Sequence, residues 1–480
     1  MCRNILTVIK GIMTENNHTH LISFLVSVFI CGVLVFSKDT ARANYSLANL
    51  QHKYVEVSGI SFHYVTKGSG QPLILLHGFP ETWYSWRKNI DALALYFQVI
   101  ALDLKGYGDS DKPGGDYSLP NLSREIADLI RTLKLENPIL VGHDWGGFIA
   151  WDVARNYPDL LDKLIILNAP LHKRDRTLSP HIEFFAIPGM LEAVVSPNCR
   201  GFLENVFRNS SYDPSGIDEK GIDVYEKSFC HADVWASVSE YFEDLIVFTS
   251  EQWQARFQTP INVPTLVIWA ENDPRQPTSY TEGMEQIVSN LELKFIPQCG
   301  HFLQAEKPEE VNSLILKYLL GDFQLPQIII AADKPSYYPG EKLTLYVSLE
   351  NPGPRIEVDI FLGVLFPDGS IYFFDPSLTT LKPAQENDAR SYTAMRTSLN
   401  LSSGNKLPSI PFYSTVLDKI LPGTYYAFAA LAEPGSAQAG SINLVGQVSL
   451  AAFSISEESP TNNSGLHQGH LRSRLGNSRL

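Results

Sequence analysis

The chain has 480 residues, 44% apolar and 19% charged, so it is long enough for roughly two to four domains and too apolar to be disordered throughout. Its 52 acidic and 38 basic residues give a net charge of −14, which repels the phosphate backbone and argues against a nucleic-acid partner. Five cysteines in this length exclude a fold held by a disulfide framework.

The N-terminal segment 1–43 is predicted to be a signal peptide. Residues 21–36 form an uncharged apolar run, preceded by basic residues and followed by Ala41-Arg42-Ala43. A basic region, an apolar run and a small-x-small site are the parts of such a signal, so we expect cleavage near Ala43 and export of the mature chain, secreted or periplasmic. The alternative is a membrane anchor at 21–36, although a spanning helix needs about 20 apolar residues.

Residues 44–322 alternate short apolar runs with amphipathic helical stretches. Such runs are typical of strands buried on both faces of a mostly parallel sheet. Strands are expected at Ile60–Thr66, Pro72–Leu76, Gln98–Leu102, Pro138–Val141, Leu164–Asn168, Thr265–Trp269 and Glu292–Ile296. The pattern predicts a three-layer α/β domain with core parts 44–170 and 263–322. Aromatic and acidic helical stretches replace the strands in 171–262, which predicts an inserted helical cap.

The pattern of residue types changes after Gly321. β-branched and aromatic runs are separated by turn signals such as Tyr338-Pro339-Gly340, which predicts an antiparallel β-sandwich over 326–456. This domain carries no catalytic constellation, and we expect an accessory role in attachment or association. Residues 457–480 are rich in Ser, Asn, Gly and Arg and are predicted to be a disordered tail.

Three cysteines remain after the predicted cleavage. Cys199 and Cys230 fall in the predicted cap, and export would allow them to pair, although the sequence leaves that pairing open. Cys299 precedes Gly300-His301 and is expected to be a small buried residue.

The strongest motif is Val141-Gly142-His143-Asp144-Trp145-Gly146-Gly147, between a predicted strand and a predicted helix. Small residues two before and two after Asp144 permit the tight turn called a nucleophile elbow, which exposes the central side chain above the sheet. A carboxylate nucleophile there opens an epoxide or displaces a halide and forms an alkyl ester. The structural alternative is an Asp that caps the helix.

A second motif, His77-Gly78-Phe79-Pro80, follows the strand Pro72–Leu76. A glycine-containing loop at this place can direct the backbone N–H of Phe79 toward the same point as that of Trp145, forming an oxyanion hole. The Phe79–Pro80 bond is a candidate cis peptide. Taken alone, the same residues are also typical of a plain Gly-Pro turn, which is the structural alternative.

The third motif is a pair of residues that follow strands. Asp273 and His301 both come after predicted strand ends, the edge at which open α/β sheets place their sites. His301 would activate water, and Asp273 would orient its ring, with Glu271 as the competitor for that role. The chain order of nucleophile, acid and histidine favours the catalytic interpretation over a structural histidine.

From about Tyr54 to Leu320 the chain resembles the epoxide hydrolases of the α/β-hydrolase superfamily. The resemblance rests on His77–Arg87, Asp103–Pro113, Gly142–Gly147, Ala270–Asp273 and Cys299–His301. It implies that Asp144 attacks an epoxide carbon and that His301 with Asp273 drives water onto the resulting ester. The substrates would be a small apolar epoxide and water. Neither a metal nor an organic cofactor is implied.

The predicted cap differs from the pattern of the epoxide hydrolases. Epoxide hydrolases usually present two cap tyrosines that hydrogen-bond the epoxide oxygen. We assign the second to Tyr241, whereas His181 stands where the first is expected. A histidine can donate the same bond, with a pH dependence that follows its pKa near 6.5. Tyr212 and Tyr225 could substitute, or the cap aromatics could simply line an apolar pocket.

Two alternatives remain open. Haloacetate and haloalkane dehalogenases resemble this chain in the Asp nucleophile and the His–Asp pair, but Phe79 and Trp145 stand where those enzymes commonly carry Asn and Arg. Arg124 is a possible ligand for a substrate carboxylate. The other alternative is a non-catalytic exported binding protein whose β-sandwich is the functional part; the intact Asp144, Asp273 and His301 argue against it.

Overall fold

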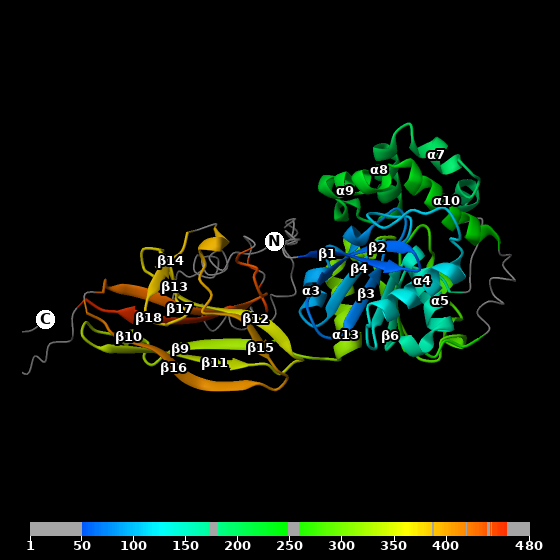
Figure 1. Cartoon of the computed structure of the whole chain (residues 1–480). Helices are drawn as coiled ribbons and strands as arrows, with labels where there is room; N and C mark the ends of the chain where they lie inside the picture. The colour runs from blue at the N-terminus through cyan, green and yellow to red at the C-terminus, as the bar shows by residue number, and fades with distance from the viewer. Residues whose placement is uncertain are drawn as a thin grey trace, which may run out of the picture.

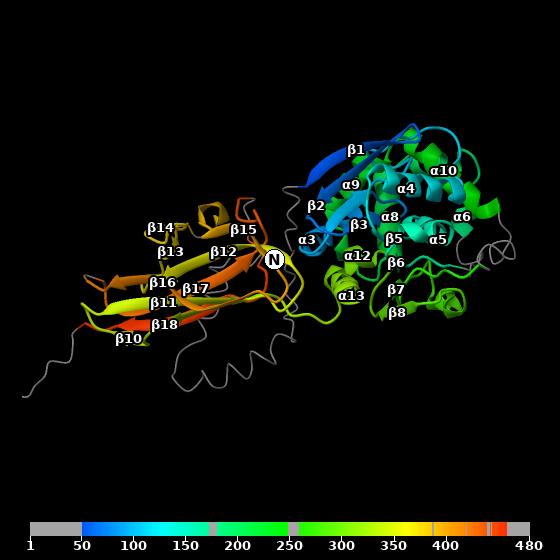
Figure 2. The same cartoon turned by 60° about the horizontal axis from the view of Figure 1, so that its bottom comes forward.

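The computed structural model describes residues 50–171, 180–247, 259–385, 388–418, 420–438, 442 and 444–457. Figures 1 and 2 show an α/β part and an all-β part side by side. The predicted signal peptide, the anchor alternative and nearly all of the predicted tail lie outside the described residues. Within the part of the chain that is described, no helix combines the length and apolarity that crossing a bilayer requires.

The α/β part is built on one eight-stranded sheet with the order β1-β2-β4-β3-β5-β6-β7-β8. The strands from β3 onward run parallel, and the first two pair antiparallel at one edge. Its strands are β1 (Gln51–Val57), β2 (Ile60–Lys67), β3 (Pro72–Leu76), β4 (Gln98–Leu102), β5 (Ile139–His143), β6 (Lys163–Leu167), β7 (Thr265–Ala270) and β8 (Leu291–Ile296). Each predicted strand of this part is present, with ends shifted by one or two residues where they differ, as is usual for strand ends.

Helices cover both faces of this sheet because its central strands are apolar on both faces. These helices are α3 (Ile90–Ala94), α4 (Leu119–Thr132), α5 (Trp145–Asn156), α12 (Leu303–Glu306) and α13 (Pro308–Leu320). Residues of α4 and α5 join one core cluster, and residues of α3 and α13 join the cluster on the opposite face. Figure 1 shows the sheet between these two layers. The predicted three-layer α/β-hydrolase architecture is confirmed.

A group of helices lies between β6 and β7 in the chain and above the sheet in Figure 1. They are α6 (Pro180–Phe185), α7 (Met190–Val195), α8 (Cys199–Ser210), α9 (Glu219–Phe229) and α10 (Ala232–Val247). A disulfide joins Cys199, at the start of α8, to Cys230, just after α9, which resolves the pairing that the sequence left open. Cys299 is a buried free cysteine, as expected.

Short 3-10 helices complete the connections. They are η1 (Trp83–Trp86), η2 (Pro158–Leu160), η4 (Pro214–Gly216), η5 (Thr278–Thr281), η6 (Met284–Gln286) and η7 (Ala389–Ser391). Of these, η1 follows the Phe79–Pro80 bond, which is cis.

The C-terminal part consists of two mostly antiparallel sheets that pack on a shared apolar core. One has the order β10-β18-β17-β12-β13-β14, with β15 also paired to β12, and the other has the order β16-β11-β9. The strands are β9 (Gln327–Ala332), β10 (Ser336–Tyr337), β11 (Lys342–Glu350), β12 (Ile356–Leu365), β13 (Ile371–Phe374), β14 (Leu381–Pro383), β15 (Arg396–Leu401), β16 (Lys406–Val416), β17 (Gly423–Ala432) and β18 (Ser449–Ile455). Alternation along β11, with every second residue buried, produces this sandwich.

Candidate active site

The turn between β5 and α5 holds Asp144 in a sharply bent conformation, with φ 49° and ψ −115°. Two glycines make this turn possible. A Cβ on Gly142 would lie 2.3 Å from the carbonyl oxygen of Gly146, and a Cβ on Gly146 would lie 2.5 Å from that of Leu76. Strained backbone of this kind is retained where function needs it. The geometry is that of a nucleophile elbow, with the carboxylate above the sheet edge.

The Asp144 carboxylate is held by one backbone N–H and one imidazole. Its Oδ1 accepts a hydrogen bond from the N–H of Phe79 at 2.9 Å, and its Oδ2 lies 3.4 Å from Nε2 of His301. Burial raises the pKa of Asp144, but the hydrogen bond and charge of His301 and the N–H of Phe79 outweigh it and lower that pKa to about 2. The carboxylate is therefore ionised and available as a nucleophile.

The N–H of Trp145 is the second predicted oxyanion donor. Trp145 is the first residue of α5 and directly follows Asp144. An N–H in the first helical turn has no acceptor within its own helix, so it can donate to a group outside the helix. The structure thus brings the N–H of Phe79 onto the Asp144 carboxylate and places Trp145 as the residue that follows it.

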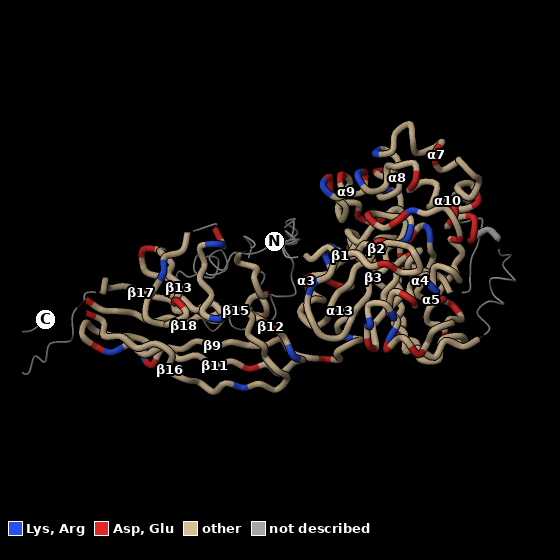
Figure 3. Tube along the Cα trace, in the orientation of Figure 1, with Lys and Arg blue, Asp and Glu red and all other residues tan. Residues whose placement is uncertain are grey.

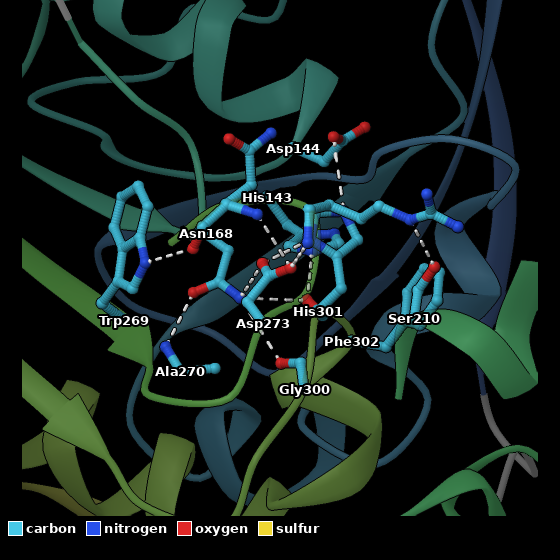
Figure 4. A network of polar contacts seen from close by, with 12 residues as sticks. His143, Asp144, Asn168, Ser210, Trp269, Ala270, Asp273, Gly300, His301 and Phe302 are labelled. Atoms are coloured by element: carbon cyan, nitrogen blue, oxygen red, sulfur yellow. Dashed lines mark hydrogen bonds and ion pairs between the residues drawn. The ribbon is translucent and has the colours of Figure 1, made fainter. Parts of the chain in front are cut away.

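Asp273 and His301 meet in the way that the chain order predicts. Nδ1 of His301 lies 2.7 Å from Oδ2 of Asp273, as Figure 4 shows. Although burial lowers the pKa of His301, the charges and hydrogen bonds of Asp273 and Asp144 raise it to about 10. Glu271, the competitor for the orienting role, is exposed to solvent.

Asp273 is fixed by donors that the sequence interpretation did not identify. Asn168, directly after β6, donates from Nδ2 to Oδ2 of Asp273 at 2.8 Å (Figure 4). The N–H groups of Arg275 and Gln276 donate to Oδ1 at 2.7 and 3.0 Å. The only available signal for Asn168 was its place at the end of a strand adjacent to β7, and chain order alone does not reveal that adjacency.

A buried polar cluster supports His301 from the other side. Nε2 of His143 lies 2.9 Å from the carbonyl oxygen of His301, to which it donates. Nδ1 of His143 lies 3.0 Å from Oε2 of Glu81 and 3.1 Å from Nε2 of Gln304. These side chains are buried, so their contacts hold the backbone at His301 in place. None of the three was predicted as a site residue.

A cavity of about 220 Å³ opens onto Asp144 and His301. Its walls are largely aromatic and include Phe79, Phe148, Phe185, Phe202, Phe242 and Phe302. Its polar lining consists of Asn205, Ser210, Arg275 and Gln276, besides the catalytic side chains. The cavity lies below the usual range for a drug-sized ligand, about 300–1,000 Å³, which favours a compact substrate with apolar surface.

Of the two cap residues predicted to bind an epoxide oxygen, the structure describes the side chain of Tyr241 only, and it directs that hydroxyl elsewhere. The hydroxyl of Tyr241 donates to the carbonyl oxygen of Lys105 at 2.7 Å, and Tyr241 does not line the cavity. The neighbouring residue Phe242 lines the cavity instead, so the cavity wall has a phenyl ring where the sequence predicts the hydroxyl of Tyr241. His181 is the second residue of α6, and its side chain lies outside the described residues.

The other cap tyrosines do not supply the missing hydroxyl. Tyr225 is fully buried and Tyr212 is exposed, and neither lines the cavity. Arg124, the carboxylate ligand of the dehalogenase alternative, lies on the exposed face of α4, where it pairs with Asp128 at 3.4 Å. Among the described residues that line the cavity, the arginine is Arg275, which the sequence interpretation did not single out.

The family described as "alpha/beta hydrolase fold" matches residues 71–212. Epoxide hydrolase 3 of Xenopus tropicalis is 32% identical over 299 residues, covering 58% of this chain and 80% of that protein. Epoxide hydrolase 4 of Homo sapiens is 34% identical over 292 residues, covering 56% of this chain and 78% of that protein.

Solved structures agree with these relatives. The epoxide hydrolase CorEH superposes with a TM-score of 0.51 at 28% identity, covering 56% of this chain and 98% of that one. The epoxide hydrolase VrEH1 of Vigna radiata superposes with a TM-score of 0.52 at 25% identity, covering 57% of this chain and 98% of that one. In each case the matched share corresponds in extent to the α/β part with its cap.

Proposed function

Because the chain belongs to the epoxide hydrolase family of the α/β-hydrolases, we propose that it opens an epoxide to a vicinal diol through an alkyl ester on Asp144. The observation that carries this proposal is the ionised Asp144 carboxylate, held at the elbow between the N–H of Phe79 and the imidazole of His301 and facing an aromatic cavity. A carboxylate so placed meets the requirement for a nucleophile aimed at a bound carbon.

In the first half-reaction a carboxylate oxygen of Asp144 attacks one epoxide carbon. The new C–O bond forms as the epoxide C–O bond breaks, and the epoxide oxygen keeps the electron pair and takes up a proton. His181 is the proposed donor from the cap, since the hydroxyl of Tyr241 is already bound to Lys105. The aromatic walls hold the apolar part of the substrate against the nucleophile.

In the second half-reaction water cleaves the ester. Esterification removes the charge of Asp144, which is one of the groups that raise the pKa of His301, so that pKa falls. The imidazolium then releases its proton to solvent, and the neutral imidazole can take a proton from water. The hydroxide adds to the ester carbonyl, and the N–H groups of Phe79 and Trp145 stabilise the oxyanion. Collapse of this intermediate breaks the bond between its carbonyl carbon and the diol oxygen. That oxygen takes the proton of the new Asp144 carboxyl group, which releases the diol and restores the Asp144 carboxylate.

Asp273 acts on this step through the ring of His301. Its contact with Nδ1 fixes the orientation of the ring and stabilises the imidazolium that forms when His301 takes the proton. Asn168 and the loop N–H groups in turn fix Asp273.

The test uses the mature chain with styrene oxide. We expect diol formation that Asp144→Ala abolishes and that Asp128→Ala, a carboxylate change on the exposed side of α4, leaves intact. In His301→Gln the ester should persist, so mass spectrometry should find the epoxide mass on the peptide that contains Asp144. Failure to trap that ester with any epoxide would overturn the proposal.

A dehalogenase acting on a halogenated acid is the second candidate function, because Arg275 places a cation in the cavity onto which Asp144 opens. Release of fluoride or chloride from haloacids, without turnover of any epoxide, would favour it. Turnover of neither class would favour an exported binding protein.

Export of the mature chain is part of the same proposal, and the Cys199–Cys230 disulfide supports it because disulfides persist in oxidising compartments. The mass of the mature N-terminus tests cleavage after Ala43 against retention as an anchor. We also propose that the β-sandwich serves attachment or association. Deleting residues 326–480 should then leave epoxide turnover intact while it changes localisation or assembly; a folded but inactive truncation would contradict that division.

A further inference from the structure

Arg275 brings a guanidinium into the catalytic cavity from the loop that follows β7. Its backbone N–H donates to Asp273, so its position is tied to the catalytic acid. Its Nε donates to the hydroxyl oxygen of Ser210 at 3.1 Å, and Ser210 is itself buried at the end of α8. Because the carbonyl of Ser210 accepts from the N–H of His301 at 2.7 Å, the guanidinium is anchored within the same framework as the triad.

This cation has no carboxylate partner among the residues that the structure describes. The contrast is Arg200 on α8, which contacts Glu219, Asp223 and Glu226 at 2.7 to 2.8 Å; Figure 3 shows the acidic and basic residues of α8 and α9 close together. A partly buried charge without a counter-ion is costly, and a ligand of opposite charge would remove that cost.

The guanidinium of Arg275 sets the sign of that ligand, because the other side chains near the nucleophile carry mostly negative charge. Asp144 and Asp273 place two carboxylates against the single imidazole of His301, and the chain as a whole carries a net charge of −14. An anionic substrate would be repelled unless a local cation attracted it. Arg275 meets that need, and the planar guanidinium binds a carboxylate through two parallel hydrogen bonds.

We propose that Arg275 is a specificity-determining residue that binds an anionic group, best a carboxylate, carried on the substituent of a compact epoxide. This inference rests on the proposed function and sharpens it: the aromatic walls take the apolar part of the substrate and Arg275 takes its charged end. The cavity of about 220 Å³ limits the distance between epoxide and carboxylate to a short chain.

The experiment measures kcat/KM for a series of terminal-epoxide carboxylates of increasing chain length, each beside its methyl ester. We expect the best acid to exceed its ester by about tenfold or more, the usual effect of a charge-assisted hydrogen bond. The preference should disappear in Arg275→Met and return in part in Arg275→Lys. Arg131→Met, which removes an exposed arginine of α4, is the matched control and should keep the preference.

The methyl esters report the catalytic machinery itself. If Arg275→Met also loses ester turnover, Arg275→Gln and Arg275→Lys carry the comparison, and an acid preference that survives in Arg275→Gln overturns the inference. Raising the salt concentration should lower kcat/KM for the acids and not for the esters, which a merely structural role of Arg275 would not produce. Equal turnover of acids and esters by an enzyme that forms the Asp144 ester overturns this inference alone. Absence of that ester with every epoxide overturns the proposed function.

Discussion

Nε2 of His301 lies 3.4 Å from Oδ2 of Asp144, so the proposed base of the second half-reaction is an ion-pair partner of the proposed nucleophile of the first. The pairing contributes to lowering the pKa of Asp144 to about 2 and to raising the pKa of His301 to about 10. In the proposed mechanism, loss of the Asp144 charge in the first step prepares His301 for the second.

This coupling predicts that the ester accumulates at acidic pH. Asp144 stays ionised and attacks at any working pH, whereas His301 must be neutral to activate water. Rapid-quench mass spectrometry should find more ester at about pH 5 than at about pH 9, since an imidazole freed from its Asp144 partner titrates closer to its ordinary range. Asp144→Ala should show none at either pH. An ester fraction that rises with pH would contradict the coupling.

Stability should fall at alkaline pH because of the same histidine. The folded-state pKa of His301 is raised from 6.5 to about 10, so its stabilisation is fully present below pH 6.5 and is lost as pH rises toward 10. Lys88, whose pKa burial lowers to about 8, contributes with the opposite sign. Urea unfolding across this window should therefore be compared with His301→Gln, which should show a smaller fall; an equal fall would refute the assignment.

Tyr241→Phe should cost stability rather than activity. The substitution leaves the buried carbonyl of Lys105 without its donor, which costs about 1–3 kcal/mol of unfolding free energy. Denaturant unfolding measures this loss, and kcat/KM for styrene oxide should change by less than about threefold because the lost hydroxyl does not face the cavity. Phe242→Ala, at the neighbouring cavity position, should change kcat/KM instead. A large loss of kcat in Tyr241→Phe would return Tyr241 to the catalytic role.

Asn168→Ala should weaken ester hydrolysis. It removes a hydrogen bond to the carboxylate of Asp273 and one accepted from the N–H of Ala270, so a drop in kcat of about tenfold is expected. The ester should accumulate in single-turnover experiments, which locates the defect in the second step. Asn156→Ala removes an equivalent bond to Asp152, far from His301, and should leave kcat unchanged.

Reduction of the Cys199–Cys230 disulfide should destabilise the cap. The bond closes a sequence separation of 31 residues, for which loop entropy predicts about 3–4 kcal/mol. The paired change of Cys199 and Cys230 to Ser should lower the temperature of thermal unfolding to the same extent as a reductant. Cys299→Ser, which changes a buried thiol outside the disulfide, is the control: a reductant should still lower its temperature of thermal unfolding.

Much of the fold follows from local patterns. Apolar runs such as Pro72–Leu76 and Gln98–Leu102 appear as strands with the expected bounds, because a strand buried on both faces leaves a continuous signal in the sequence. The proposed nucleophile can also be recognised in the sequence, since the elbow requires small residues at fixed offsets from Asp144.

The cap side chains that face the cavity do not follow from local patterns. Adjacent residues on a helix point about 100° apart, so the sequence does not say whether Tyr241 or Phe242 of α10 faces the cavity; packing against Trp145 and the carbonyl of Lys105 decides it. Likewise Asn168 reaches Asp273, 105 residues later in the chain, only because β6 and β7 pair.

By itself, then, the sequence determined the α/β framework, the β-sandwich, the elbow that carries Asp144 and the order of the residues that follow it, because each depends on a local pattern or on fixed spacing. Tertiary structure alone decided which cap side chain enters the cavity, which groups hold Asp273, and that Arg275 lines the same cavity as Asp144. Those outcomes depend on contacts between segments distant in the chain, and an arginine in a loop has no local pattern that distinguishes a cavity from the solvent.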